Sequence, residues 1–355
     1  MKFFIFVHIL LIFNLNGLAE RKLEFNRDIR PILSDGCFHC HGPDEKKRKG
    51  GLRLDLESDA FKDGKSGFPA IVKEDPLESE LITRIFLAED DEEHMPPLDS
   101  GKSITLEQKE ILKKWIEEGA KYQGHWAFIN PRRIPVPKVI GVKHPIDGFI
   151  QKRLSEEGMQ MQALADKETL LRRVSLDLTG LPPNLSEVDD FLADTSEDAY
   201  EKVLDRLLGS QHYGERMAIE WLDLARYADS NGYQSDGSRD MWLWRDWLIN
   251  AFNRNIPFDQ FTIEQLAGDM LPNPSQDQVV ATGFNRNHRL NGEGGRIVDE
   301  WFVETVIDRV ETTGTTWLAL TMTCARCHDH KYDPISQKEF FEFFAYFNSN
   351  DESGV

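Results

Sequence analysis

Near its N-terminus the chain reads Cys37-Phe38-His39-Cys40-His41, two cysteines separated by two residues with a histidine directly after the second. In a C-x-x-C-H motif the two thiols add to the vinyl groups of a haem, and the adjacent imidazole ligates the iron axially. The stretch therefore predicts a haem c bound covalently to Cys37 and Cys40. Its iron would have His41 as one axial ligand.

The same spacing returns near the other end of the chain, in Cys324-Ala325-Arg326-Cys327-His328, and the two motifs contain all four cysteines. Repetition with a histidine after each pair favours haem over two disulfides. We therefore expect a second haem c on Cys324 and Cys327, with His328 as an axial ligand. A zinc site stays open here as an alternative, because Cys324, Cys327, His328 and His330 offer four ligands on one short loop.

The second axial ligand of the first iron is predicted from the stretch Met95-Pro96-Pro97. A thioether is a soft ligand, and His/Met ligation is common in electron-transfer cytochromes c. The two prolines stiffen the backbone that carries the methionine. Met95 is therefore the expected ligand, and His94 is its rival. The second iron has no such partner, and four residues remain open as its sixth ligand: His288, Met322, His330 and Tyr332.

Composition and charge exclude several classes of function. The 355 residues have a formal net charge of -19, which would repel nucleic acid. The only basic run is Lys46-Lys47-Arg48-Lys49, which predicts a solvated loop or a docking patch for an acidic partner. No segment after the N-terminal leader approaches the roughly 20 apolar residues of a transmembrane helix, so we expect no membrane span.

The N-terminus has the layout of a secretory signal peptide at residues 1–19. Lys2 precedes an apolar run from Phe3 to Phe13, and small residues stand before a cut expected after Ala19. We therefore expect an exported, periplasmic or extracytoplasmic protein. Export agrees with covalent haem attachment, which takes place outside the cytoplasm.

Hydrophobic periodicity predicts a mainly α fold with two domains. A cytochrome c-like haem domain is expected at 20–121, a proline-rich and aromatic linker at 122–144, and a larger helical domain at 145–355. The stretch from Gly50 to Leu56 is expected as a short strand or an irregular segment. Helices are expected at 23–34, 77–88, 105–119, 146–157, 167–178, 186–193, 199–208, 214–228, 240–252, 258–268, 299–320 and 336–347.

Two polar loops in the larger domain are further candidates for function. Residues 229–240 are rich in oxygen ligands, but they lack the spacing of an EF-hand, which favours a turn held by Asx hydrogen bonds over a calcium site. Residues 285–295 include Arg286 and Arg289, which can pair with haem propionates or an anionic substrate. No catalytic residue is assigned.

Taken together, these motifs resemble the planctomycete-type cytochrome c family, in which a cytochrome c-like domain precedes a conserved domain of unknown function with its own C-x-x-C-H. The resemblance implies His41 and Met95 as axial ligands. It also implies a further C-terminal domain in longer homologues, which leaves open whether the chain is a fragment. The matching stretches are 25–33, 37–42, 50–55, 95–97 and 115–116, then 178–183, 226–229, 231–233 and 324–335.

The function expected from the sequence is electron transfer to or from a redox partner protein by an exported cytochrome with two haems. One alternative is a haem-dependent oxidoreductase that acts on a small molecule such as a carbohydrate or peroxide. The other is a single-haem cytochrome fused to a zinc-stabilised interaction domain. An electron carrier is favoured over a stand-alone enzyme.

Overall fold

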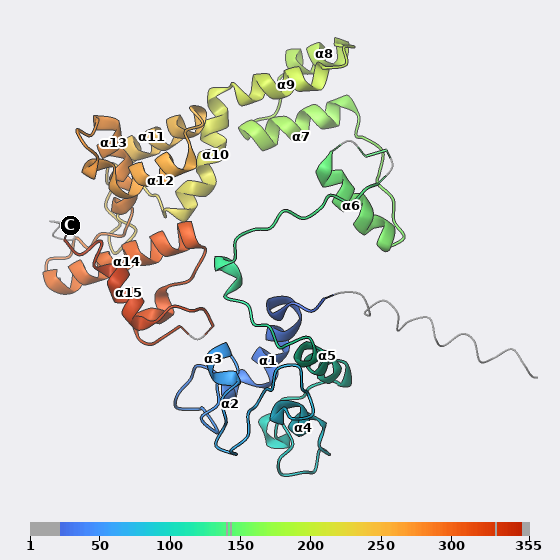
Figure 1. The fold of residues 1–355 in the computed structure, drawn as a ribbon. Helices are drawn as coiled ribbons and strands as arrows, with labels where there is room; N and C mark the ends of the chain where they lie inside the picture. Colours follow the sequence, from blue (N-terminus) through green and yellow to red (C-terminus); the bar gives the residue numbers. More distant parts are fainter. Residues whose placement is uncertain (1–21, 140, 143, 331, 350–355) are drawn as a thin grey trace, which may run out of the picture. The chain divides into compact units, whose positions relative to one another are not determined.

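The computed structural model describes residues 22–139, 141–142, 144–330 and 332–349, so the expected signal peptide at 1–19 lies outside the described residues. Chain contacts define two compact units (Figure 1). The first is Met1–Pro131 with Lys331–Pro334, and the second is Arg132–His330 with Ile335–Val355. The expectation of a mainly α fold is confirmed: the described residues form fifteen α-helices and no named strand. None of these helices is long and apolar enough to cross a membrane.

Short helices joined by long loops build the first unit. Pro31 stands in the first turn of α1, where its missing N–H costs no helical hydrogen bond, so it starts this helix rather than bending it. A capping box between Thr105 and Gln108 starts α5. The elements are a π-helical turn η1 (Phe25–Ile29), α1 (Arg30–Gly36), α2 (Phe38–His41), α3 (Glu57–Ala60), α4 (Glu80–Phe86), η2 (Leu98–Ser100), α5 (Leu106–Glu117) and η3 (Trp126–Phe128).

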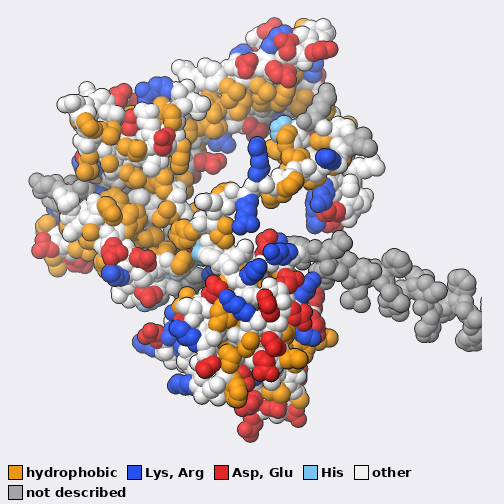
Figure 2. All heavy atoms as spheres, in the orientation of Figure 1, with side chains coloured by type: hydrophobic (Ala, Val, Ile, Leu, Met, Phe, Trp, Pro, Cys, Tyr) orange, Lys and Arg blue, Asp and Glu red, His pale blue; other side chains and the backbone are white. Residues whose placement is uncertain are grey.

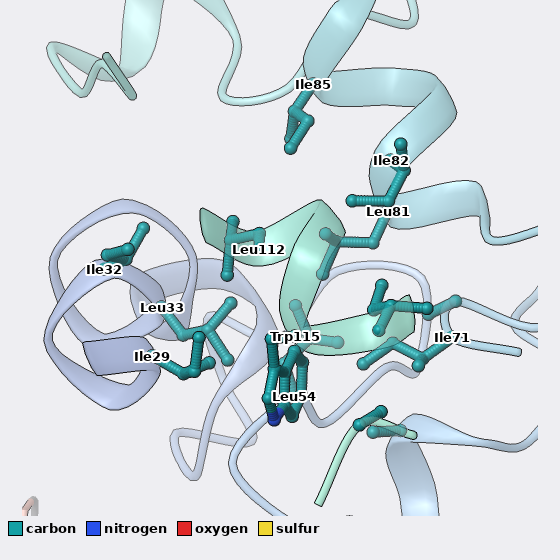
Figure 3. Close-up of a cluster of buried hydrophobic side chains, with 14 of the residues drawn as sticks. Ile29, Ile32, Leu33, Leu54, Ile71, Leu81, Ile82, Ile85, Leu112 and Trp115 are labelled. Carbon is teal, nitrogen blue, oxygen red and sulfur yellow. The ribbon is translucent and has the colours of Figure 1, made fainter. Parts of the chain in front are cut away.

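One hydrophobic core joins α1, α4 and α5 (Figure 3). Leu33 of α1 and Leu112 of α5 are fully buried, and Trp115 of α5 is 2% exposed. Burying side chains of this size contributes roughly 1.5–3 kcal/mol each, before the entropic cost of folding. The core therefore provides a rigid base directly before the first C-x-x-C-H, because α1 ends at Gly36.

The segment from Gly50 to Leu56 is irregular and does not form a strand. Gly50 and Gly51 have φ values of +61° and +68°, a left-handed conformation that interrupts extended backbone. Acidic side chains gather at the end of this unit where α4 lies (Figure 2). They include the exposed residues Asp90 to Glu93 of the acidic run after α4.

The second unit is built from longer helices. Asp166 caps α7 by accepting from the backbone N–H of Thr169. Asn184 forms the capping box of α8 with Glu187. The helices are α6 (Pro145–Glu156), α7 (Lys167–Thr179), α8 (Leu185–Ala193), α9 (Ala199–Leu208), α10 (Gln211–Leu224), α11 (Trp242–Asn253), α12 (Phe258–Ala267), α13 (Gln276–Ala281), α14 (Val298–Leu318) and α15 (Gln337–Phe344), with 3-10 turns η4 (Gly268–Met270), η5 (Thr282–Arg286) and η6 (Thr323–Arg326).

Three hydrophobic clusters hold this unit together. One packs α7, α8 and α9. A second, rich in aromatic rings, lies around Trp244 and Trp247 of α11. The third lies between α14, η6 and α15 and includes Met322, Phe340 and Phe347. Trp242, at the start of α11, is by contrast 45% exposed.

Candidate haem sites

The first C-x-x-C-H forms a single tight turn. The carbonyl oxygen of Cys37 accepts hydrogen bonds from the backbone N–H groups of Cys40, at 3.1 Å, and His41, at 2.8 Å. This turn, α2, follows directly on α1. Both thiols and the imidazole are therefore presented from one turn of backbone, as covalent attachment and axial ligation require.

The turn ends at Gly42, where the backbone passes close to the carbonyl oxygen of Phe38. A Cβ atom placed on Gly42 would lie 2.3 Å from the carbonyl oxygen of Phe38, so only glycine fits. The following loop folds back on the motif through two backbone hydrogen bonds. Lys49 N–H donates to Cys40 O at 2.8 Å, and Leu54 N–H donates to His41 O at 2.9 Å.

The first motif lies against the core of its unit. Cys37 packs against the core cluster. Burial raises the pKa of its thiol to about 12, with a smaller contribution from Cys40. Burial also lowers the pKa of His41, and the charge of Arg84 adds to this effect while the Lys49 backbone opposes it. His41 is therefore held as neutral imidazole, the form that ligates iron.

Met95 lies against the same core as Cys37. Its backbone N–H donates to Arg84 O at 3.1 Å, which fixes the loop to α4. A Cβ atom on Gly36, the residue before Cys37, would lie 4.0 Å from Cγ of Pro96. The structure therefore brings the Met95-Pro96 segment beside the start of the first motif.

The side chain of His94 is 8% exposed. Its Nδ1 lies 3.1 Å from the carbonyl oxygen of Pro96. Its Nε2 is buried and has no hydrogen-bond partner. The loop thus presents two possible iron ligands, at adjacent positions.

These residues fit a haem c. The cysteines are free thiols. The neutral His41 imidazole and the Met95 thioether belong to the set that ligates haem iron. A bound haem would supply a one-electron redox centre. His41 Nδ1 is buried without a hydrogen-bond partner.

The second C-x-x-C-H has different surroundings. Cys324, Cys327 and His328 are exposed. The Nδ1 of His328 lies 2.7 Å from the carbonyl oxygen of Asp329, so Nδ1 donates this bond and Nε2 keeps its lone pair. Gln337 at the start of α15 anchors the loop, because its Nε2 donates to Arg326 O at 3.1 Å.

Charged side chains of α14 hold this second loop. Glu304, Asp308 and Glu311 follow one another at helical spacing and share one face of the helix. Arg326, between the two cysteines, donates from Nη1 to Glu304 Oε2 at 3.1 Å. Burial raises the pKa of Glu311, and a hydrogen bond with Thr323 beside the motif opposes the shift.

The candidates for the sixth ligand of a second iron lie as follows. Met322 is 5% exposed in the third cluster, and its Cγ would lie 2.4 Å from a Cβ on Gly314. His288 is 3% exposed and contacts Arg309 Nη2 through its Nε2, at 3.3 Å. The backbone N–H of His330 donates to Ile335 O at 2.8 Å. Tyr332 belongs to the first unit.

The zinc alternative has no preformed site in the described part of the chain. There, no group of three His, Cys, Asp or Glu side chains is placed to hold a metal ion. The four residues proposed for zinc are therefore not brought together in this way. In the loop 229–240, where calcium was considered, the carboxylate of Asp236 accepts from the Gly232 N–H at 2.7 Å.

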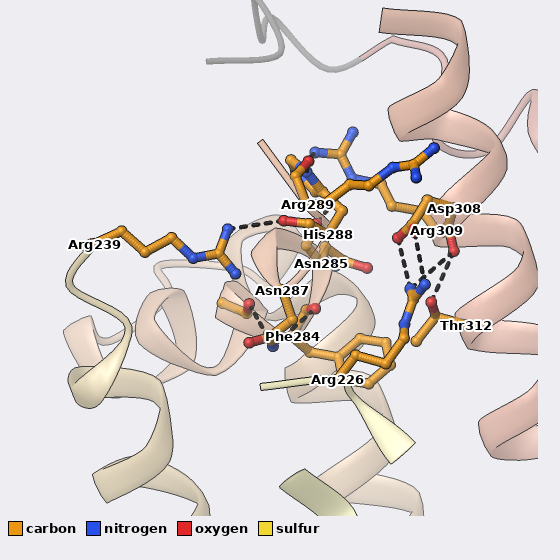
Figure 4. A network of polar contacts seen from close by, with 11 residues as sticks. Arg226, Arg239, Phe284, Asn285, Asn287, His288, Arg289, Asp308, Arg309 and Thr312 are labelled. Atoms are coloured by element: carbon orange, nitrogen blue, oxygen red, sulfur yellow. Dashed lines mark hydrogen bonds and ion pairs between the residues drawn. The ribbon is translucent and has the colours of Figure 1, made fainter. Parts of the chain in front are cut away.

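A polar cavity lies beside α14 (Figure 4). Its volume is about 10 Å³, which is close to the smallest space that holds one water molecule. Arg226 has a left-handed backbone, with φ of +58°. Its guanidinium binds both carboxylate oxygens of Asp308, each at 2.6 Å. The cavity is lined by Ala225, Arg226, Phe284, Asn285, Asn287, His288, Asp308, Arg309 and Thr312.

Two amide side chains that line the cavity are oriented by the backbone. Asn285 Nδ2 donates to Gln265 O at 3.2 Å, and Asn287 Nδ2 donates to Phe284 O, also at 3.2 Å. Both Oδ1 atoms are buried without a hydrogen-bond partner. Because only the NH₂ groups can donate to carbonyl oxygens, the amide assignment is settled and two acceptors remain unused.

The sequence singled out Arg286 and Arg289 in this loop, and the structure uses them differently. Arg286 is exposed. Arg289 lies over the rings of Tyr233 and Trp301, 5.4 Å from each centroid. Sequence analysis pointed to the loop 285–295 but singled out its arginines rather than Asn285 and Asn287, and it gave no role to the Arg226–Asp308 pair. No local pattern joins these residues, because segments distant in the sequence build the cavity.

Comparison with known families agrees with the two-part organisation. The family described as Planctomycete cytochrome C matches residues 37–99. The family described as Protein of unknown function (DUF1549) matches residues 145–352. No curated protein and no solved structure gave a significant match. The chain therefore belongs to the DUF1549 family and carries in front of that domain a cytochrome c-like haem domain of the planctomycete type.

Proposed function

We propose that this chain is an exported c-type cytochrome that transfers electrons to or from a redox partner protein. The supporting observation is the convergence at the first motif. Cys37 and Met95 pack against one core, and Pro96 approaches Gly36. His/Met ligation raises the reduction potential and suits an electron carrier.

We propose further that the chain carries two haems, the second bound by Cys324 and Cys327 with His328 on its iron. Both thiols are free and exposed, so attachment needs no rearrangement of a core. The Nδ1–H of His328 donates to a backbone carbonyl, an arrangement common for ligating histidines, and leaves Nε2 for the iron.

Counting covalent haems tests both statements. The full chain is matured in a periplasm and compared with Cys37→Ser/Cys40→Ser and Cys324→Ser/Cys327→Ser variants by intact mass and pyridine haemochrome assay. We expect two haems in the parent and one in each variant, and a mature N-terminus directly after Ala19. The two-haem proposal would be contradicted if the parent had one haem and lost it only when Cys37 and Cys40 were changed.

Ligation by Met95 is tested by potentiometry. Because a thioether ligand raises the potential, Met95→Ala should lower that of the first haem by on the order of 0.1 V. The near-red band of the sulfur–iron bond should disappear in parallel. Met159→Ala, an exposed methionine in the second unit, serves as the control and should change neither. An unchanged spectrum in Met95→Ala would contradict the assignment.

A second candidate function is an oxidoreductase acting on a small molecule such as a carbohydrate or peroxide. The observation that bears on it is the cavity beside α14, where Asn285 Oδ1 and Asn287 Oδ1 have no hydrogen-bond partner among the described residues; its volume of about 10 Å³ favours a peroxide over a carbohydrate. A hydroxyl group supplies such a donor. The Arg226–Asp308 pair and Glu311 extend this polar region toward Thr323 and the second motif.

Two measurements test this candidate. Carbon monoxide binding to the reduced protein reports an open iron. Reduction of hydrogen peroxide to water by the ferrous protein reports turnover, and Asn287→Leu should suppress it without changing the haem count. If neither iron binds carbon monoxide and the ferrous protein does not reduce peroxide, the oxidoreductase loses its support and the electron carrier is the remaining proposal.

A further inference from the structure

His94 has the hydrogen-bonding state of a metal ligand. Its Nδ1 lies 3.1 Å from Pro96 O, and a carbonyl oxygen only accepts, so Nδ1 carries the proton. Nε2 therefore holds a lone pair. Ligating histidines commonly donate their other ring N–H to a backbone carbonyl or carboxylate, which orients the ring and raises its basicity.

The lone pair of His94 has no partner among the residues that the structure describes. Nε2 is buried without a hydrogen bond, and the residue is 8% exposed. A buried unsatisfied acceptor costs roughly 1–3 kcal/mol, so its presence calls for an explanation. Solvent does not provide one, because the atom is shielded from water.

The position of His94 in the chain supplies the explanation. It directly precedes Met95, whose N–H binds Arg84 O at 3.1 Å, and the next residue approaches Gly36 at the first motif. Residues 89–93 before it are exposed and irregular, so the loop can shift without opening the core. Because the two residues are adjacent, a shift of this loop by one residue would bring His94 to the position that Met95 holds, at the loss of the hydrogen bond to Arg84 O.

We propose that His94 is a reserve axial ligand, whose Nε2 takes the sixth position of the first iron when the Met95 thioether is not bound. This inference rests on the proposed haem at Cys37 and Cys40. The exchange replaces sulfur with nitrogen and keeps the iron six-coordinate. The first iron then stays closed to small ligands even without its methionine.

Electron paramagnetic resonance and carbon monoxide binding of the full holoprotein test the proposal. In Met95→Ala the first iron should stay low-spin, with a signature of two nitrogen ligands. In Met95→Ala/His94→Ala it should become high-spin and bind carbon monoxide when reduced. A second haem would give the same signals in both variants, so subtracting one spectrum from the other leaves only the change at the first iron.

Met95→Ala/Glu92→Ala is the matched control, since Glu92 is an exposed residue of the same loop. It should remain low-spin. A high-spin first iron in Met95→Ala alone, at unchanged haem content, would overturn the proposal while leaving electron transfer intact. His94→Ala alone should keep the sulfur–iron band of the parent. A parent that lacks this band, and whose first iron becomes high-spin in His94→Ala, would make His94 the resting ligand and overturn the reserve role. Absence of haem from the parent would instead refute the proposed function.

Discussion

The two C-x-x-C-H motifs share their spacing but have opposite surroundings. The first packs against the core of the first unit. It ends at Gly42, where the carbonyl oxygen of Phe38 leaves no room for a side chain. In the second, both cysteines and the histidine are exposed on the loop between α14 and α15. In the first motif a cysteine packs against the core. In the second it is Ala325, between the exposed cysteines, that lies in a hydrophobic cluster, and Glu304 of α14 and Gln337 of α15 hold the loop.

This contrast shows that the motif specifies attachment, whereas its surroundings determine what the site does. Axial ligand, burial and hydrogen bonding are the properties by which a protein tunes a haem. The first motif has a methionine, a histidine and a shielding core beside it. The second has Glu304, Glu311 and Arg326 around it and a polar cavity nearby on α14.

Thiol reactivity in the haem-free, reduced protein should show the largest difference. Burial raises the pKa of Cys37 from 9.0 to about 12, so near neutral pH its thiolate is roughly a thousandfold scarcer than for an ordinary thiol. Only the thiolate is alkylated. We expect Cys324 and Cys327, which are exposed, to react with iodoacetamide before Cys37, as followed by peptide mass spectrometry.

Denatured protein is the control, because all four thiols should then react alike. Equal rates for Cys37 and Cys324 in the native haem-free protein would mean that the first motif is open to solvent. The proposed difference in burial between the two motifs would then be wrong.

Gly42→Ala should come next in size. The added Cβ would lie 2.3 Å from Phe38 O, and backbone cannot yield as a side chain does. We expect a loss of about 3 kcal/mol in the unfolding free energy of the first unit and less haem on Cys37 and Cys40. Haem content and denaturant unfolding measure both effects.

Gly294→Ala is the matched control for this substitution. No atom lies within 4 Å of its added Cβ, so stability and haem content should be unchanged. A Gly42→Ala protein with full haem content and parent stability would show that the first turn is looser than the structure has it.

Helix positions were largely predictable from the sequence, because caps are local. Thr105 with Gln108 and Asp166 with Thr169 satisfy backbone N–H groups within one turn. Helix α13 was missed although Ser275 and Gln278 form the same capping box, since it is only six residues long. The possible strand at 50–56 was not formed because two left-handed glycines start that segment.

The candidate sites were predictable only where the chemistry is contiguous in the sequence. The motif at Cys37 and the Met95-Pro96-Pro97 stretch could be read directly. The cavity beside α14 could not, because it joins Arg226 to residues 284–288 and 308–312 by tertiary packing. Hydrogen bonds of Asn285 and Asn287 to distant or local carbonyls leave no trace in hydrophobic periodicity.

Gly314→Ala tests the support of the second motif and should have a moderate effect. Its Cβ would lie 2.4 Å from Cγ of Met322, which stands two residues before Cys324. Because Met322 is flexible, we expect about 2 kcal/mol of destabilisation in the second unit, measured by denaturant unfolding. Gly295→Ala, with no atom within 4 Å of the added Cβ, should have no effect. Unchanged stability in Gly314→Ala would mean that Met322 does not hold this loop.

Arg326→Ala should give the smallest effect, and it defines how firmly α14 holds the second motif. The Arg326 side chain is 38% exposed and that of Glu304 is 26% exposed, so water screens much of their attraction. We expect a loss of about 0.5 kcal/mol in the unfolding free energy of the second unit. This free energy should also depend less on salt concentration than in the parent. Lys338→Ala removes the more exposed pair with Glu342 on α15 and should change nothing measurable. If both substitutions act alike, the pair between Arg326 and Glu304 is ordinary surface charge, and the second loop depends on Gln337 and Met322 instead.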